Sequence, residues 1–151
     1  MNRHFSYQLA TRKNLLAATE SLSLEALNAI PHGFNNSIAW NLAHVLVTQQ
    51  LLLYGMSGNE CRIDDSFIAR FRKGTKPEDA ISQDDFDSLQ ELLISSVEWA
   101  SEDYEQGIFT EYKDYTTSYG VKLSSIEDAI MFNNLHESMH LGYVMAMKRA
   151  I

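Results

Sequence analysis

The segment from Ile38 to Met56 contains no charged side chain and is mostly apolar. Three residues that favour helix starts, Asn35, Asn36 and Ser37, come before it, and Ser57-Gly58 follows it. A helix that is apolar on every side must lie inside a bundle or be covered by a partner. Whatever fold this chain adopts therefore has to surround this helix.

Apolar residues at three-to-four spacing predict three further long helices around it. We expect the first from about Phe5 to Leu22, with Phe5, Leu9, Leu16 and Thr19 facing inward and Arg12, Lys13 and Glu20 available to solvent. A capping box, Ser82-x-x-Asp85, opens the next helix, which Gly107 ends. The last helix follows Ser124-Ser125 and runs to about Arg149.

The connections between these helices complete the predicted fold. A short helical turn is expected over residues 24–29 and another over 65–71, and residues 109–119 favour a loop or a loose hairpin. Residues 59–81 are long enough for a connection that crosses the bundle. We therefore expect an all-α fold, a four-helix bundle with a long first crossover connection, formed by one domain over residues 1–151.

Charge and cysteine content exclude several classes of function. The net charge is −8, from 12 basic and 20 acidic residues, which disfavours nucleic acid as a partner. No apolar run is long enough to span a bilayer, and the first residues lack the apolar core of a signal peptide. With one cysteine, Cys61, no intrachain disulfide can form. We expect a cytoplasmic protein that contacts neither membrane nor nucleic acid.

Histidines on two predicted helices point to a metal site. His136 and His140 belong to an H-E-x-x-H sequence and lie four residues apart, on the inward stripe of the last helix. The same spacing places His44 on an apolar face of the segment after Ser37. A lone buried histidine is more often hydrogen-bonded than metal-bound, but three inward histidines all need partners, and one divalent ion satisfies them together.

Three histidine ligands leave one position open, as in catalytic zinc sites. Imidazole ligation suits Zn, Ni, Cu or Fe, and of these we expect zinc or nickel. His4 and His32, outside the long helices, are expected to be exposed to solvent.

Zinc peptidases use the glutamate of H-E-x-x-H as a general base and usually take their third ligand from further along the chain. Residues 141–151 contain no His, Asp, Glu or Cys, so here the third ligand must come from upstream, and His44 is the best-placed candidate. Glu137 is turned about 100° from His136 on the helix. Glu137 is therefore a candidate catalytic residue. The alternative is that it is a surface carboxylate or that it orients a metal ligand.

These residues resemble the DinB-like (DinB/YfiT) superfamily over nearly the whole chain. The resemblance is carried by the stretch from Phe34 to His44, by Asp65-Ser66-Phe67 and residues 71–75, and by His136-Glu137-x-x-His140-x-Gly142. It implies a four-helix bundle with a divalent metal on His44, His136 and His140. It also implies thiol-dependent S-transferase or isomerase activity with a low-molecular-weight thiol, and a homodimer. Many relatives have Gln where this chain has Tyr143, which leaves the role of that position open.

Three hypotheses about function follow. The first is a metal-dependent enzyme with thiol-dependent S-transferase chemistry on a small-molecule substrate, in a pocket lined by Trp40, Asn41, Asn133 and Tyr143. The second is a metal-dependent hydrolase with Glu137 as the base for a metal-bound water. The third is a dimer that binds a metal or a small ligand without catalysis.

Overall fold

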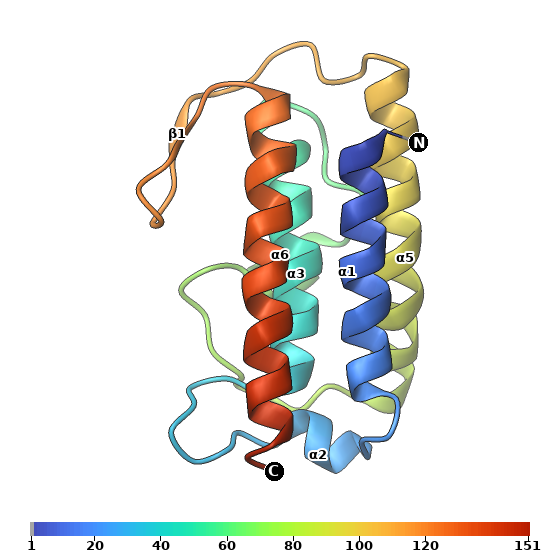
Figure 1. Cartoon of the computed structure of the whole chain (residues 1–151), viewed down its shortest axis with the longest axis vertical. Helices are drawn as coiled ribbons and strands as arrows, with labels where there is room; N and C mark the ends of the chain where they lie inside the picture. Colours follow the sequence, from blue (N-terminus) through green and yellow to red (C-terminus); the bar gives the residue numbers. More distant parts are fainter. Residues whose placement is uncertain (1) are drawn as a thin grey trace.

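The computed structural model describes residues 2–151 and has an all-α fold, as the sequence predicts. Four long helices form its body: α1 (Arg3–Thr19), α3 (Ile38–Leu53), α5 (Gln83–Glu105) and α6 (Ile126–Lys148). Figure 1 shows them side by side, with α1 and α6 running in one direction and α3 and α5 in the other. Each of α1 and α3 contacts both α5 and α6, so α1 and α3 lie on opposite corners.

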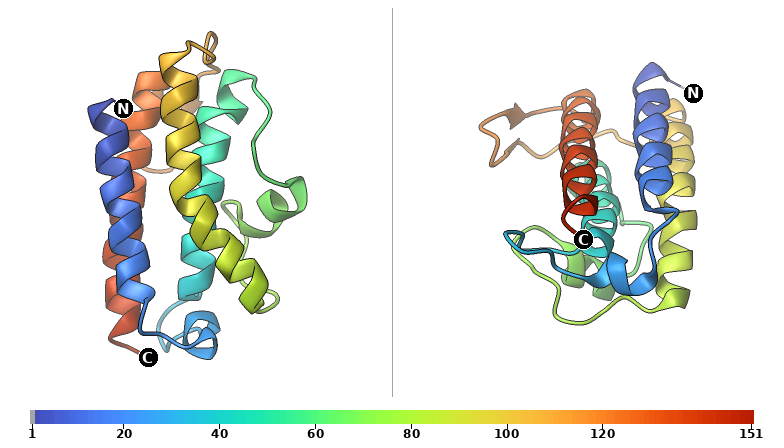
Figure 2. Two further views of the ribbon diagram at one scale, coloured as in Figure 1. Left: turned by 90° about the vertical axis from the view of Figure 1, so that its right-hand side faces the viewer. Right: turned by 60° about the horizontal axis from the view of Figure 1, so that its bottom comes forward.

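The remaining elements lie in the connections. They are α2 (Leu24–Asn28), the 3-10 turn η1 (Gly55–Ser57), α4 (Asp65–Phe71), and the short antiparallel pair β1 (Tyr115–Thr116) and β2 (Lys122–Leu123). Because α3 and α5 run in the same direction, the segment between them must travel back along the bundle, and α4 packs on α3 on the way (Figure 2). The expected long crossover is thus present, and it places α4 beside the middle of the bundle.

Serine side chains start several helices, as the sequence predicts. The hydroxyl oxygens of Ser37, Ser82 and Ser125 accept hydrogen bonds from the backbone N–H groups of Trp40, Asp85 and Asp128. Gly107 follows the C-terminal end of α5 and has a φ of +71°, a left-handed conformation that favours glycine. The first helix is shorter than expected and ends at Thr19.

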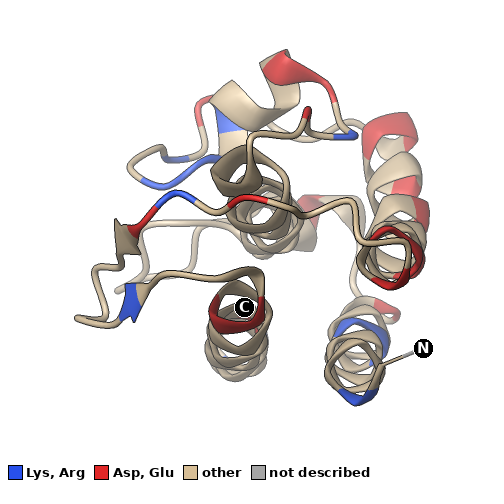
Figure 3. Cartoon of the chain, turned by 90° about the horizontal axis from the view of Figure 1, so that it is seen from above, with Lys and Arg blue, Asp and Glu red and all other residues tan. Residues whose placement is uncertain are grey.

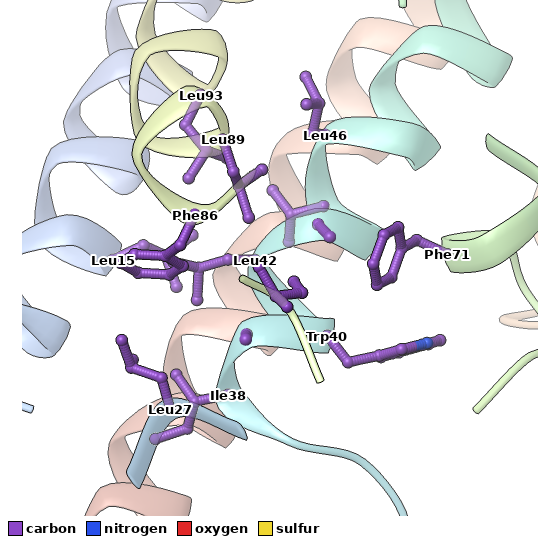
Figure 4. Close-up of a cluster of buried hydrophobic side chains, with 14 of the residues drawn as sticks. Leu15, Leu27, Ile38, Trp40, Leu42, Leu46, Phe71, Phe86, Leu89 and Leu93 are labelled. Atoms are coloured by element: carbon purple, nitrogen blue, oxygen red, sulfur yellow. The ribbon is translucent and has the colours of Figure 1, made fainter. Parts of the chain in front are cut away.

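The α3 helix is enclosed, as its lack of charge requires. Every residue from Ile38 to Leu53 is buried except Thr48 and Leu51, which are half-buried. Figure 4 shows its two sides: Leu15, Leu89 and Leu93 lie on the side of α1 and α5, and Trp40 and Phe71 on the opposite side. Within residues 2–151, no helix combines the length and apolar character needed to cross a bilayer. The expected cytoplasmic location stays a prediction.

One prediction about α1 is wrong. The sequence predicts that Arg12 faces solvent, but its side chain is fully buried, because the inward stripe of α1 is Phe5, Gln8, Arg12, Leu15 and Thr19. The predicted stripe and the observed stripe both follow three-to-four spacing, and the predicted one is the more apolar. His4 and His32, in contrast, are exposed as predicted.

Candidate metal centre

The packing of α3 against α6 brings together three histidines, although His44 lies 92 residues before His136 and 96 residues before His140. His44, His136 and His140 each offer a ring nitrogen, and these three atoms lie within 4.8 Å of one another. The Nε2 atoms of His136 and His140, one helical turn apart, are 3.2 Å apart. The His44 ring centroid lies 5.2 Å from that of His136 and 5.0 Å from that of His140. Three nitrogens from two facing helices thus point to one place.

Hydrogen bonds determine which nitrogen of two of these rings carries the proton. The Nδ1 of His44 is 2.7 Å from the carbonyl oxygen of Phe71, which can only accept, so Nδ1 is the N–H. The Nδ1 of His140 lies 2.8 Å from Oδ1 of Asn41, whose amide nitrogen donates to the Ser37 carbonyl. That nitrogen bond orients the amide with its oxygen toward His140. Both rings therefore present an unprotonated Nε2, the form that binds metals.

Burial keeps the three rings neutral. It lowers the pKa of His136 to about 2, with further contributions from the positive forms of His140, His44 and Arg12. Burial, followed by the neighbouring His44, lowers the pKa of His140 to about 4. Burial also lowers the pKa of His44, against the opposing effect of its bond to the Phe71 carbonyl. At pH 7 the cluster consists of neutral imidazoles, so a metal that binds them does not have to displace a proton.

The arrangement fits a divalent transition metal. In a tetrahedral site with metal–nitrogen bonds of about 2.0–2.1 Å, neighbouring ligand atoms lie about 3.3–3.4 Å apart. The 3.2 Å between the Nε2 atoms of His136 and His140 is close to that spacing. Among residues 2–151, the buried Nδ1 of His136 has no hydrogen-bond partner, and the contact of this ring is through its Nε2, which faces the Nε2 of His140.

Two cavities border the cluster from different directions. The larger, of about 400 Å³, reaches His44 and His136 between α3, α6, the segment after α4 and the hairpin. The smaller, of about 260 Å³, lies beside His140 and is lined also by Asn35, Asn36, Asn41, Met139 and Tyr143. A metal on the three histidines would therefore be reachable by small molecules.

Of the four residues expected to line the pocket, two line a cavity beside the histidines and two do not. Asn41 and Tyr143 line the smaller cavity. Trp40 lines neither cavity; its indole stacks on the His44 ring, with centroids 4.7 Å apart and planes at 10°. Asn133 is buried and donates a hydrogen bond to Glu137. Trp40 thus holds His44 in place from behind, and Asn133 belongs to another cluster.

Glu137 lies in the interface with α1. Its Oε1 accepts hydrogen bonds from Gln8, Asn133 and the Nη2 of Arg12, and its Oε2 accepts one from the Nε of Arg12, each at 2.8 Å. Arg12 also donates to the Leu93 carbonyl and the Ser96 hydroxyl on α5. Glu137 is fully buried and lines neither cavity. These contacts favour a structural role over the expected catalytic one.

Sequence reasoning missed Arg12 and Gln8 as the partners of Glu137. A signal was present, since Phe5, Gln8, Arg12 and Leu15 follow one helical stripe. A charged residue on an otherwise inward stripe indicates a buried partner of opposite charge. Among the described residues of α3, α5 and α6, Glu137 is the one buried carboxylate, and it is the partner that this rule selects for Arg12.

Comparison with known proteins supports one assignment. No curated protein matches the chain. The sequence model of the DinB superfamily matches residues 9–144, which include all three histidines, Arg12 and Glu137. This match covers most of the chain. The all-α fold of the chain and its three-histidine cluster fit a protein that binds a metal. The chain belongs to the DinB superfamily.

Proposed function

We propose that the protein is a metal-dependent enzyme that transfers a low-molecular-weight thiol to an electrophilic small molecule. His44, His136 and His140 hold a divalent ion, zinc or nickel, through their Nε2 atoms. The observation that carries this proposal is the convergence of three neutral imidazoles beside a cavity of about 400 Å³. Three ligands from the protein leave coordination positions for a substrate.

His44, His136 and His140 would hold a divalent ion, and that ion would lower the pKa of a bound thiol enough for the thiolate to form at neutral pH. The protein's own groups orient the site: the Phe71 carbonyl and the Asn41 amide fix the rings of His44 and His140. In the reaction, sulfur forms a bond to an electrophilic carbon, the bond from that carbon to a halide breaks, and the thiol proton passes to solvent. With an epoxide, the carbon–oxygen bond breaks and the oxygen takes up a proton.

The hydrolase alternative loses its principal support. It needs Glu137 as a base for a water at the metal, but this carboxylate is bonded to Arg12, Gln8 and Asn133 and lines neither cavity. The non-catalytic alternative, a protein that binds a metal or small ligand, uses the same histidines and is separated from the enzyme by experiment.

Metal content and conjugation activity test the proposal together. The wild type, His44→Ala and the matched surface control His32→Ala are compared for zinc and nickel content by mass spectrometry. Conjugation of 1-chloro-2,4-dinitrobenzene is then measured with cysteine, 2-mercaptoethanol or glutathione as the thiol. We expect metal and thiol-dependent conjugation in the wild type and in His32→Ala, and neither in His44→Ala.

Other results separate the alternatives. Full stoichiometric metal in His44→Ala refutes the ligand assignment. Metal in the wild type without any conjugation, together with unfolding on chelation, favours the non-catalytic protein. Turnover of an ester substrate without added thiol favours the hydrolase.

We also propose that the protein forms a homodimer through α6. From residue 129 to 147 the only charged residue of this helix is the buried Glu137, and Figure 3 shows how few charged residues α3 and α6 carry. Large apolar side chains on its outer surface are 41–56% exposed: Met131, Leu135, Met139, Tyr143 and Met145. An exposed apolar face of this length indicates a protein interface. A second copy here would also cover the cavity beside His140, which Met139 and Tyr143 line.

Light scattering coupled to size-exclusion chromatography tests the dimer. We expect the wild type to elute at twice the mass of one chain, and Met139→Glu to elute as a monomer. The matched control is Ala17→Glu, which places the same charge on the exposed side of α1. A monomeric wild type, or a dimer in Met139→Glu, refutes this interface.

A further inference from the structure

We propose that the larger cavity selects anionic small molecules, through Arg72 and Lys73 at its wall. The ligand class is an elongated molecule with a carboxylate or phosphate at one end and an apolar body. Its other end reaches His44 and His136. This inference rests on the proposed function only for what happens at that end; the recognition of the anion is a property of the cavity itself.

The charges on the cavity wall are the first support. Among the described residues, its lining includes two cations, Arg72 and Lys73, and no carboxylate. In a chain with 20 acidic and 12 basic residues, this wall has the opposite sign to the protein as a whole. An anion entering the cavity therefore meets an attractive field, and a cation meets a repulsive one.

Neither cation is used by the fold. Within residues 2–151, no hydrogen bond or ion pair involves the guanidinium of Arg72 or the ammonium of Lys73. Their neighbour Arg70 differs, because its guanidinium donates to the carbonyls of Asp79 and Ala80. Of the basic residues in this segment, Arg70 thus has a structural role, while Arg72 and Lys73 keep their donors available at the cavity.

The backbone that carries both cations is tied to the histidine cluster. Phe71, whose carbonyl oxygen binds the Nδ1 of His44, is buried and immediately precedes Arg72. The backbone N–H of Arg72 donates to the Ile68 carbonyl, and the hydroxyl of Thr75 donates to the carbonyls of Arg70 and Arg72. The backbone at Arg72 is therefore held close to His44, which limits the length of a ligand that reaches both the histidines and the two cations.

The rest of the lining defines the body of the ligand. Leu51, Leu52, Met56 and Phe132 supply apolar surface, and the hairpin side adds hydroxyl groups, from Tyr115, Thr117 and Ser118. The Thr117 hydroxyl already donates to the Val121 carbonyl. Such a wall accommodates an alkyl or aryl segment between the two polar ends.

Binding of three probes with the same six-carbon chain tests the inference: hexanoate, hexyl phosphate and the neutral hexanamide. Isothermal titration calorimetry is performed with the zinc-loaded wild type, the Arg72→Gln/Lys73→Gln variant, and a control. The control, Lys13→Gln/Lys76→Gln, makes the same change in net charge at exposed positions that line neither cavity. Zinc content of every sample is measured alongside.

We expect the wild type and the control to bind at least one anionic probe about tenfold or more tightly than hexanamide. Arg72→Gln/Lys73→Gln should lose most of that preference and keep its affinity for hexanamide. The relative affinities of hexanoate and hexyl phosphate then identify whether the anion is a carboxylate or a phosphate. Because zinc is the same in these proteins, a preference caused by the metal alone would survive in the variant.

Two results overturn the inference. One is a wild type that does not prefer either anion, including a wild type that binds none of the three probes at millimolar concentration. The other is an undiminished preference in Arg72→Gln/Lys73→Gln. A wild type that retains no zinc but shows a preference dependent on Arg72 and Lys73 refutes the proposed metal centre and leaves the anion site intact.

Discussion

Replacing Glu137 with glutamine should destabilise the protein strongly, because it leaves the charge of Arg12 buried without a counter-ion. Both side chains are fully buried, and two parallel hydrogen bonds of 2.8 Å join them. Removing one partner of a buried ion pair costs about 3–5 kcal/mol. For a domain of this size, that corresponds to a fall in melting temperature of roughly 6–20 °C.

Substituting Arg12, alone and together with Glu137, measures how much the buried ion pair contributes to the free energy of unfolding. Arg12→Met leaves a buried carboxylate, but Gln8 and Asn133 still donate to it, so we expect a loss near the lower end, about 3 kcal/mol. Arg12→Met/Glu137→Met removes both charges and replaces them with apolar side chains of similar length. The double variant should be far more stable than the sum of the single losses, within about 2 kcal/mol of the wild type.

Urea unfolding of the four proteins at pH 7.5, followed by circular dichroism, measures these differences. Zinc content is determined on the folded fraction, where we expect Glu137→Gln to bind metal like the wild type. The refuting result is a Glu137→Gln protein that unfolds at the same urea concentration as the wild type but has lost turnover. That outcome would return Glu137 to the role of general base.

Three further predictions concern the histidines and the start of α6. Asn41→Ala removes the acceptor for the Nδ1–H of His140, so zinc affinity should fall about 10–100-fold in competition with a chelator; an unchanged affinity contradicts the ring-orienting role. Without metal, the free energy of unfolding should decrease as the pH falls below about 6.5. In that range the histidines of the unfolded chain become protonated, whereas in the folded chain His136 and His140 stay neutral down to their pKa values of about 2 and about 4. The expected slope is about 1.4 kcal/mol per pH unit for each histidine, and a flat urea-unfolding profile between pH 5 and 7 would contradict it. Ser125→Ala should cost about 1 kcal/mol in the same assay, because it removes the acceptor for the Asp128 backbone N–H.

Much of the candidate site could be predicted because its determinants are local. Serine caps and apolar spacing define where α3 and α6 begin and which way each residue points. From those phases His44, His136 and His140 share inward faces, and two packed helices can then bring them within 4.8 Å. The resemblance to the superfamily names the same three residues, and the family match covers them.

The role of Glu137 could not be predicted in the same way. The motif suggests a base near the metal, and helical geometry alone leaves its direction relative to α1 undetermined. Its partner Arg12 lies 125 residues earlier in the chain. The sequence places Arg12 on the solvent side because Leu9 and Leu16 form a more apolar stripe than Gln8 and Arg12. Only the packing of α1 against α6 shows that the polar stripe is the inward one.

By itself, the sequence determined an all-α chain built around one uncharged helix, with three histidines on inward helix faces. Spacing within a helix settles these features, because each depends on residues within a few turns of one another. The tertiary structure alone decided that Glu137 is bonded to Arg12, that Trp40 backs His44, and that Arg72 and Lys73 line the cavity beside the histidines. Those contacts join segments distant in sequence, and their partners are selected by how the helices pack and by where the long connection returns along the bundle.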